Sequence, residues 1–123
     1  MKNNLFFLPQ AQKELYKLVA RNGKLNDLLK RKLSDLEDID IKEGLKSKKI
    51  KIIKGISSKI ILKLKKSGYN PNIYEYRDFP KSYPLRIFFL LKGFDIQILM
   101  IIHHKEMKDK FIKVLTDRLK TIE

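Results

Sequence analysis

Residues 73–103 read IYEYRDFPKSYPLRIFFLLKGFDIQILMIIH, and this stretch decides the fold. It contains three strand-like runs, Ile73 to Phe79, Leu85 to Leu91 and Asp95 to His103. The short connections between them contain proline or glycine, which suits turns between antiparallel neighbours. The sequence therefore predicts a three-stranded antiparallel meander.

The segments on either side of the meander have the patterns of a strand and of helices. Leu5 to Leu8 has the length and composition of a short buried strand. Pro9 suits the first turn of a helix that ends at Asn22-Gly23, and a second helix follows from about Leu25 to Ile39. We expect these helices to form an antiparallel hairpin that covers the sheet. A last helix, Met107 to Ile122, carries one apolar face.

The stretch from Ile41 to Ser67 carries two opposed signals. Its isoleucines between positions 50 and 56 fit a strand, whereas Ile60, Ile61 and Leu64 fit a short helix. We predict an irregular segment with at least one helical turn. Together the elements predict a single α+β domain over residues 1–123, with an N-terminal strand, a helical hairpin, a three-stranded antiparallel meander and a C-terminal helix.

The composition narrows the class of protein. A chain of 123 residues can build one core without metal or disulfide support. It has no cysteine, which excludes disulfides and thiolate metal sites and agrees with a cytoplasmic protein. The longest apolar run, Ile98 to Ile102, is too short to cross a bilayer, and residues 1–10 do not resemble a secretory signal. We expect a soluble protein with no membrane partner.

A strong positive charge is the clearest global property. The chain has 28 Lys+Arg against 14 Asp+Glu, a net charge of +14. From Gly44 to Tyr74 no acidic residue occurs, so this stretch could follow a phosphate backbone. An acidic protein partner and a simply solvated surface are the alternatives. The candidate RNA-binding residues are Lys46, Lys48, Lys49, Lys51, Lys54, Lys63, Lys65 and Lys66.

Arginines and histidines gather in and directly after the predicted meander. They are Arg77, Arg86 and the triplet His103-His104-Lys105. Cutting RNA by attack of the 2′-hydroxyl needs a proton acceptor, cations around the developing negative charge, and a proton donor for the leaving oxygen. Guanidinium, ammonium and imidazole groups supply these functions near neutral pH. We therefore take these five residues as candidates for a catalytic site.

Each candidate also has a structural alternative. Arg77 would hold phosphate oxygens with its planar fork, or pair with Glu75 or Asp78. Arg86 shares a strand face with Phe88 and Leu90, and would serve either the substrate or the fold. Successive strand residues point to opposite faces, so at most one histidine points into a shared cleft. That divergence argues against a metal site, and no cofactor is expected.

Four short motifs occur in the order and spacing of a known toxin family. With this order of elements, the chain resembles the RelE/ParE toxin superfamily, in particular its RelE/HigB-like and phage-derived branches. The family often has a tyrosine at the start of the last helix where this chain has lysines, so His103, His104 or a lysine would act as the base. The motifs are Leu5-Phe6-Phe7-Leu8-Pro9-Gln10-Ala11, Ile73-Tyr74-Glu75-Tyr76-Arg77, Tyr83-Pro84-Leu85-Arg86-Ile87-Phe88-Phe89 and Ile101-Ile102-His103-His104-Lys105.

The resemblance implies the toxin of a type II toxin–antitoxin system. Such toxins are most often metal-independent endoribonucleases (mRNA interferases) that enter the ribosome, cut mRNA and inhibit translation. The implied partners are a cognate antitoxin, mRNA and the ribosome, with the groove beside the last helix as a seat for an antitoxin helix. A ParE-type poison of DNA gyrase without nuclease activity, and a basic RNA-binding module, are the alternatives.

Overall fold

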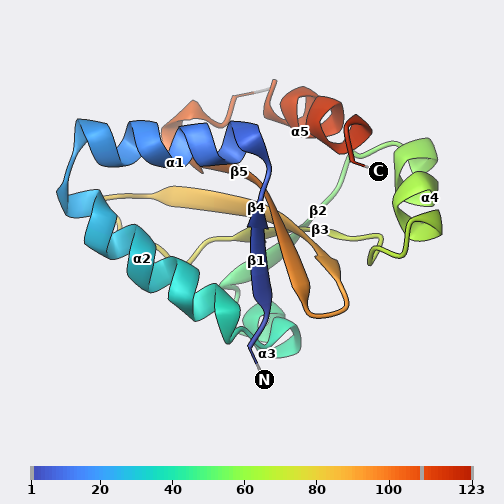
Figure 1. Cartoon of the computed structure of the whole chain (residues 1–123), viewed down its shortest axis with the longest axis horizontal. Coiled ribbons are helices and arrows are strands. Elements are labelled where there is room, and N and C mark those ends of the chain that lie inside the picture. The colour runs from blue at the N-terminus through green and yellow to red at the C-terminus, as the bar shows by residue number, and fades with distance from the viewer. Residues whose placement is uncertain (1, 109, 123) are drawn as a thin grey trace.

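A five-stranded sheet runs through the middle of the molecule, in the order β1-β5-β4-β3-β2 (Figure 1). The computed structural model describes residues 2–108 and 110–122, and its α+β class agrees with the prediction. The strands are β1 (Asn4–Phe7), β2 (Ile50–Ile53), β3 (Ile73–Tyr76), β4 (Leu85–Lys92) and β5 (Asp95–His103). The helices are α1 (Pro9–Arg21), α2 (Lys24–Glu37), α3 (Ile41–Lys46), α4 (Ser58–Lys66) and α5 (Phe111–Lys120), with a 3₁₀ turn η1 (His104–Glu106).

The sheet is larger than the predicted meander. Strands β3, β4 and β5 pair antiparallel in sequence order, as the meander requires. However, β2 adds antiparallel to β3 on one side, and β1 adds parallel to β5 on the other. The sheet is therefore mixed and five-stranded, and it differs from the predicted three-stranded meander by the added strands β2 and β1. Four-residue strands such as β1 and β2 gain their stability from a partner distant in sequence, which local patterns do not reveal.

The segment between Ile41 and Ser67 contains helical turns, as predicted, but it is regular rather than irregular. This stretch folds as α3, β2 and α4. Both helices begin at a side-chain cap, since the carboxylate of Asp40 accepts a hydrogen bond from the Glu43 amide and the hydroxyl of Ser57 accepts one from the Ile60 amide. Such caps satisfy amide groups that a first turn leaves unpaired.

The C-terminal helix is shorter than predicted. Helix α5 begins at Phe111 rather than at Met107, because the chain first forms η1 directly after β5. Position 109 of the predicted helix lies outside the described residues. Across the described part of the chain, none of the helices is long and apolar enough to span a membrane.

Two apolar cores lie on opposite faces of the sheet. On the first face, here called the α1 face, Leu85, Ile87 and Phe89 of β4 pack with residues of α1 and α2. On the second, the α5 face, Phe88 and Leu90 pack with residues of α4 and α5. The predicted alternation along β4 is thus confirmed. Each fully buried side chain of this size contributes about 1.5–3 kcal/mol, so the two cores hold both helical layers on the sheet.

Strand β5 contains one extra residue. Phe88 lies opposite Met100 while its neighbour Phe89 lies opposite Ile98, which leaves Leu99 without a partner in β4. This is a β-bulge. Leu99 and Met100 consequently both belong to the core on the α5 face.

Candidate functional site

Two candidate arginines share the α5 face at one end of the sheet. Tyr76 lies opposite Ile87, so the next position of the same register sets Arg77 opposite Arg86. The Arg77 amide donates to the carbonyl oxygen of Lys49 (2.7 Å), which ties this position to the chain that enters β2. The structure therefore brings two of the predicted catalytic residues together.

A buried carboxylate lies beside these arginines. Glu75 is only 4% exposed, and among the described residues it is the charged residue that is buried. It lies between Lys51 of β2 and Phe88 of β4 in the sheet register. Its Oε1 is 3.5 Å from Nε of Arg77, so the ion pair considered from the sequence is present. We call Lys51, Glu75, Arg77 and Arg86 the arginine site.

The guanidinium of Arg86 is held in a partly buried position. Its Nη1 donates to the carbonyl oxygen of Leu85 (2.8 Å). Desolvation by burial lowers the pKa of Arg86; the charge of Glu75 opposes this shift and the charge of Arg77 adds to it. Two cations that repel each other beside a single carboxylate gain stability when a further anion binds. The side chain of Arg77 is 39% exposed and is thus accessible to such an anion.

An apolar cavity adjoins the arginine site. It has a volume of about 370 Å³ and shares Lys51 with that site. The ring of Phe111, on its wall, lies 5.8 Å from the ring of Phe88 between centroids. An aromatic wall with lysines at its rim suits a nucleobase whose phosphate lies beside the arginines. The lining residues are Lys51, Ile52, Ile53, Lys54, Phe111 and Ile112.

The two histidines take different positions: His103 lies on the sheet face opposite the arginines, and His104 lies just after the end of β5. His103 is opposite Leu85, a residue of the α1-face core, and it lines a cavity with Lys17 and Arg21 of α1. Its Nδ1 accepts a hydrogen bond from the Lys105 amide (3.1 Å), which caps η1. His104 is exposed, and its amide donates to the carbonyl oxygen of Pro84 (2.7 Å). His104 and the exposed Lys105 therefore lie at the same end of the sheet as Arg86.

The predicted RNA-binding lysines fall into two groups. The first extends from the end of α3 to the residue after β2, the outermost strand beside β3, and the second lies on α4. All eight are exposed, and Lys51 and Lys54 of the first group line the cavity beside the arginine site. The first group is Lys46, Lys48, Lys49, Lys51 and Lys54, and the second is Lys63, Lys65 and Lys66.

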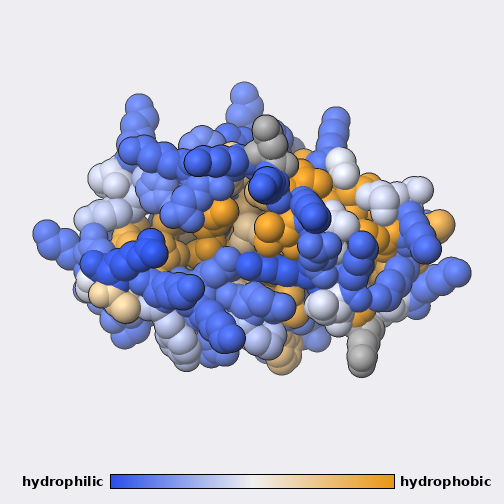
Figure 2. Space-filling model, turned by 90° about the horizontal axis from the view of Figure 1, so that it is seen from above, coloured by the Kyte–Doolittle hydropathy of each residue, from blue (hydrophilic) through white to orange (hydrophobic). Residues whose placement is uncertain are grey.

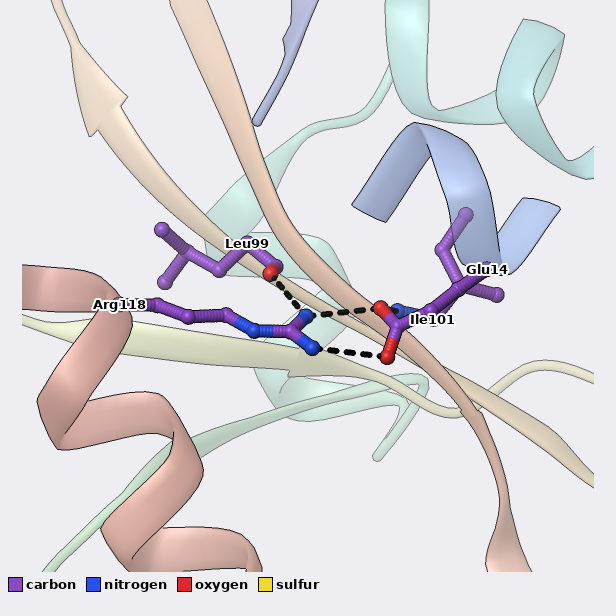
Figure 3. A network of polar contacts seen from close by, with 4 residues as sticks. All are labelled: Glu14, Leu99, Ile101 and Arg118. Carbon is purple, nitrogen blue, oxygen red and sulfur yellow. Dashed lines mark hydrogen bonds and ion pairs between the residues drawn. The ribbon is translucent and has the colours of Figure 1, made fainter. Parts of the chain in front are cut away.

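Sequence reasoning missed a second polar network, at the edge of β5. The guanidinium of Arg118 in α5 forms two hydrogen bonds to the carboxylate of Glu14 in α1, of 2.7 and 2.9 Å (Figure 3). The same guanidinium donates to the carbonyl oxygen of Leu99 (2.8 Å), and the carboxylate accepts from the amide of Ile101 (3.2 Å). We call this pair the edge clasp, because it joins two helices over the uncovered backbone of β5.

An acidic cavity lies elsewhere, beside the buried ring of Tyr76. Burial raises the pKa of the Tyr76 hydroxyl, and the negative charges of Asp78 and Asp35 raise it further. Five carboxylates repel a phosphate, so this cavity of about 420 Å³ does not suit RNA. The described residues contain no group of three or more side chains arranged to hold a metal ion. Its acidic lining residues are Asp35, Asp38, Asp40, Glu43 and Asp78.

Comparison of the chain with protein-family models, curated proteins and solved structures finds no match. The geometry defines a basic α+β protein with an arginine site on one face of its sheet. Its relationship to the RelE/ParE toxins rests on the sequence motifs and stays a prediction.

Proposed function

We propose that this protein is a metal-independent endoribonuclease, the toxin of a type II toxin–antitoxin pair, which cuts mRNA on the ribosome. The observation that carries the proposal is the arginine site, where Arg77 and Arg86 share a sheet face beside the buried carboxylate of Glu75. A net charge of +14 supports binding to a polyanion in general, whereas this local arrangement supports chemistry on a single phosphate.

The two guanidinium groups fit the charge changes of the reaction. A phosphodiester carries one negative charge, and attack by the 2′-oxygen adds a second one at phosphorus. Planar guanidinium groups hold two oxygens at once and stabilise that extra charge. Glu75 acts as a positioning residue, because its ion pair with Arg77 limits the orientations of that side chain.

The neighbouring groups complete the proposed site. A base of the RNA would stack against Phe111, with Lys51 and Lys54 at the flanking phosphates. In the reaction the 2′-oxygen loses its proton and bonds to phosphorus, and the bond from phosphorus to the 5′-oxygen breaks. The products are a 2′,3′-cyclic phosphate and a 5′-hydroxyl. We assign proton transfer to the exposed imidazole of His104, which accepts the proton of the 2′-hydroxyl and returns it to the leaving 5′-oxygen, and phosphate binding to Lys105.

The test compares cleavage of mRNA by the native chain and by variants, with purified ribosomes. Arg77→Ala is expected to lower the cleavage rate by about 100-fold or more, because the transition state loses a bidentate donor. Arg77→Lys keeps the charge but not the fork, and is expected to restore a minor part of the rate. Arg31→Ala, an exposed arginine on α2, is the matched control and is expected to leave the rate unchanged.

Expression in bacteria separates the alternatives. The proposal expects arrested growth with cut mRNA, relieved by Arg77→Ala or by double alanine substitution of His103 and His104. Arrest with intact mRNA, or full toxicity of these variants, would contradict the nuclease and favour a gyrase poison. RNA binding that weakens with salt, without toxicity or cleavage, would instead indicate an RNA-binding module.

A further inference from the structure

The outer edge of β5 is covered by β1 along part of its length. Strand β1 pairs with Asp95 to Ile98, and the Leu8 amide closes this ladder on the carbonyl oxygen of Ile98 (3.0 Å). From Leu99 to His103, β5 has β4 on one side and no strand on the other. An uncovered strand edge presents backbone donors and acceptors to any extended chain that reaches it.

The edge clasp occupies part of this uncovered edge. The carboxylate of Glu14 accepts a hydrogen bond from the amide of Ile101, and the guanidinium of Arg118 donates one to the carbonyl oxygen of Leu99. In an antiparallel strand the amide and carbonyl of one residue face the same side, and those of every second residue do so too. The carbonyl of Ile101 and the amide of His103 therefore face outward. The carbonyl of His103, the N-cap of η1, belongs instead to the first turn of that helix. Within the described residues no hydrogen bond from another element to these two groups is present.

A groove follows this edge from α1 to α5. It consists of two adjoining cavities, of about 240 and 270 Å³, which share Glu14, Ile102 and Glu106 in their linings. Seen from above, apolar side chains lie in a hollow between hydrophilic ones on this face of the molecule (Figure 2). The apolar lining residues include Leu18, Ile102, Phe111 and Val114.

The rim of the groove is basic. Lys17 and Arg21 of α1 lie on one side, and Lys108 and Lys110 lie on the side that leads into α5. The carboxylate of Glu14 is already paired with Arg118, which leaves Glu106 as the acidic group opposing these four cations in the lining. The rim is therefore complementary to an acidic partner.

We propose that this groove binds an extended, acidic segment of a protein partner, which adds to the free edge of β5 as a strand. Backbone groups of Ile101 and His103 pair with the segment, alternate apolar side chains enter the groove, and the acidic side chains between them meet the basic rim. A nucleic acid would meet the same positive charge but has no backbone that matches a strand edge. The proposal does not rest on the arginine site, because neither Arg77 nor Arg86 lines this groove.

The probe is a fluorescein-labelled heptapeptide in which valine alternates with aspartate or glutamate. Two analogues carry N-methyl groups, one on the valine amides and the other on the acidic residues' amides. In a strand the amides of one set face β5 and those of the other face solvent. If the peptide adds to β5 as a strand, one analogue should bind at least tenfold more weakly than the parent peptide, and the other should bind as tightly as the parent. A lysine-for-acid peptide is expected not to bind.

Protein variants locate the site. The double variant Lys17→Glu with Lys108→Glu is expected to weaken binding at least tenfold. The control is Lys24→Glu with Lys30→Glu, two exposed lysines on α2, and it is expected to change the affinity by less than twofold. Amide resonances of Ile101 and His103 should shift on titration. Equal binding of both N-methyl analogues, or unchanged resonances at His103, would overturn the proposal. Arg77→Ala should bind the peptide with unchanged affinity, so the peptide experiment tests this proposal even if the nuclease proposal fails.

Discussion

The edge clasp should be a major contributor to stability, and Arg118→Met tests this. Methionine keeps a long apolar side chain but removes three hydrogen bonds, two to Glu14 and one to the carbonyl oxygen of Leu99. It also leaves the carboxylate of Glu14 without its counter-charge. Removing one partner of a fully buried pair costs about 3–5 kcal/mol.

The exposure of the two side chains lowers this figure. The side chain of Arg118 is 13% exposed and that of Glu14 is 28% exposed, so water screens the pair in part. We therefore expect the free energy of unfolding to fall by about 2–3 kcal/mol in Arg118→Met. That is a large share of the roughly 5–15 kcal/mol that stabilises a domain of this kind.

Urea denaturation followed by circular dichroism measures the effect. A double-mutant cycle with Glu14→Gln, which keeps an oxygen for the Ile101 amide, should give a coupling energy of about 1–2 kcal/mol. Lys113→Met, on the same helix and exposed, is the control and should change stability by less than about 0.5 kcal/mol. A loss below about 0.5 kcal/mol in Arg118→Met, or a coupling energy near zero, would refute this account of the clasp.

Two further predictions concern α3 and the acidic cavity. A Cβ added at Gly44 would lie 2.5 Å from Cδ1 of Ile50, so Gly44→Ala should destabilise the fold by about 1–3 kcal/mol in urea denaturation. Gly23→Ala, where a Cβ meets nothing within 4 Å, is the control, and a similar loss there would refute the steric explanation. Because the pKa of Tyr76 is raised in the folded state, its stabilisation is complete below pH about 10 and is lost as pH rises further. Above that pH the native protein should lose about 1.4 kcal/mol per pH unit more than Tyr76→Phe, and parallel stability curves for the two proteins would contradict this.

The parts of the fold predicted correctly from the sequence are those with strong local patterns. Pro9 and Asn22-Gly23 bound α1, and the alternation along β4 assigns each side chain to its observed face. The segment 41–67 failed because its elements are short, and the apolar periodicity of four to nine residues fits more than one structure. Its two side-chain caps, at Asp40 and Ser57, were the available signals.

The candidate site was predicted in part for a similar reason. Arg77 and Arg86 follow from strand pairing, which the turn lengths indicated. Glu75 was considered as a partner for Arg77, but its burial depends on β2 lying beside β3, a contact that the sequence did not predict. The edge clasp joins residues 104 positions apart, and no pattern in the sequence connects them.

The bulge at Leu99 determines which residues share a face after it. If the same residues of β5 paired with β4 in a regular ladder, the odd-numbered positions from 97 to 103 would all lie on one face, and His103 would share the face of the arginines. The bulge reverses this parity, so Ile102 faces the α5 side and His103 faces α1. The bulge thus separates an imidazole from the arginine site, and a regular register of the same residues would place both on the same face.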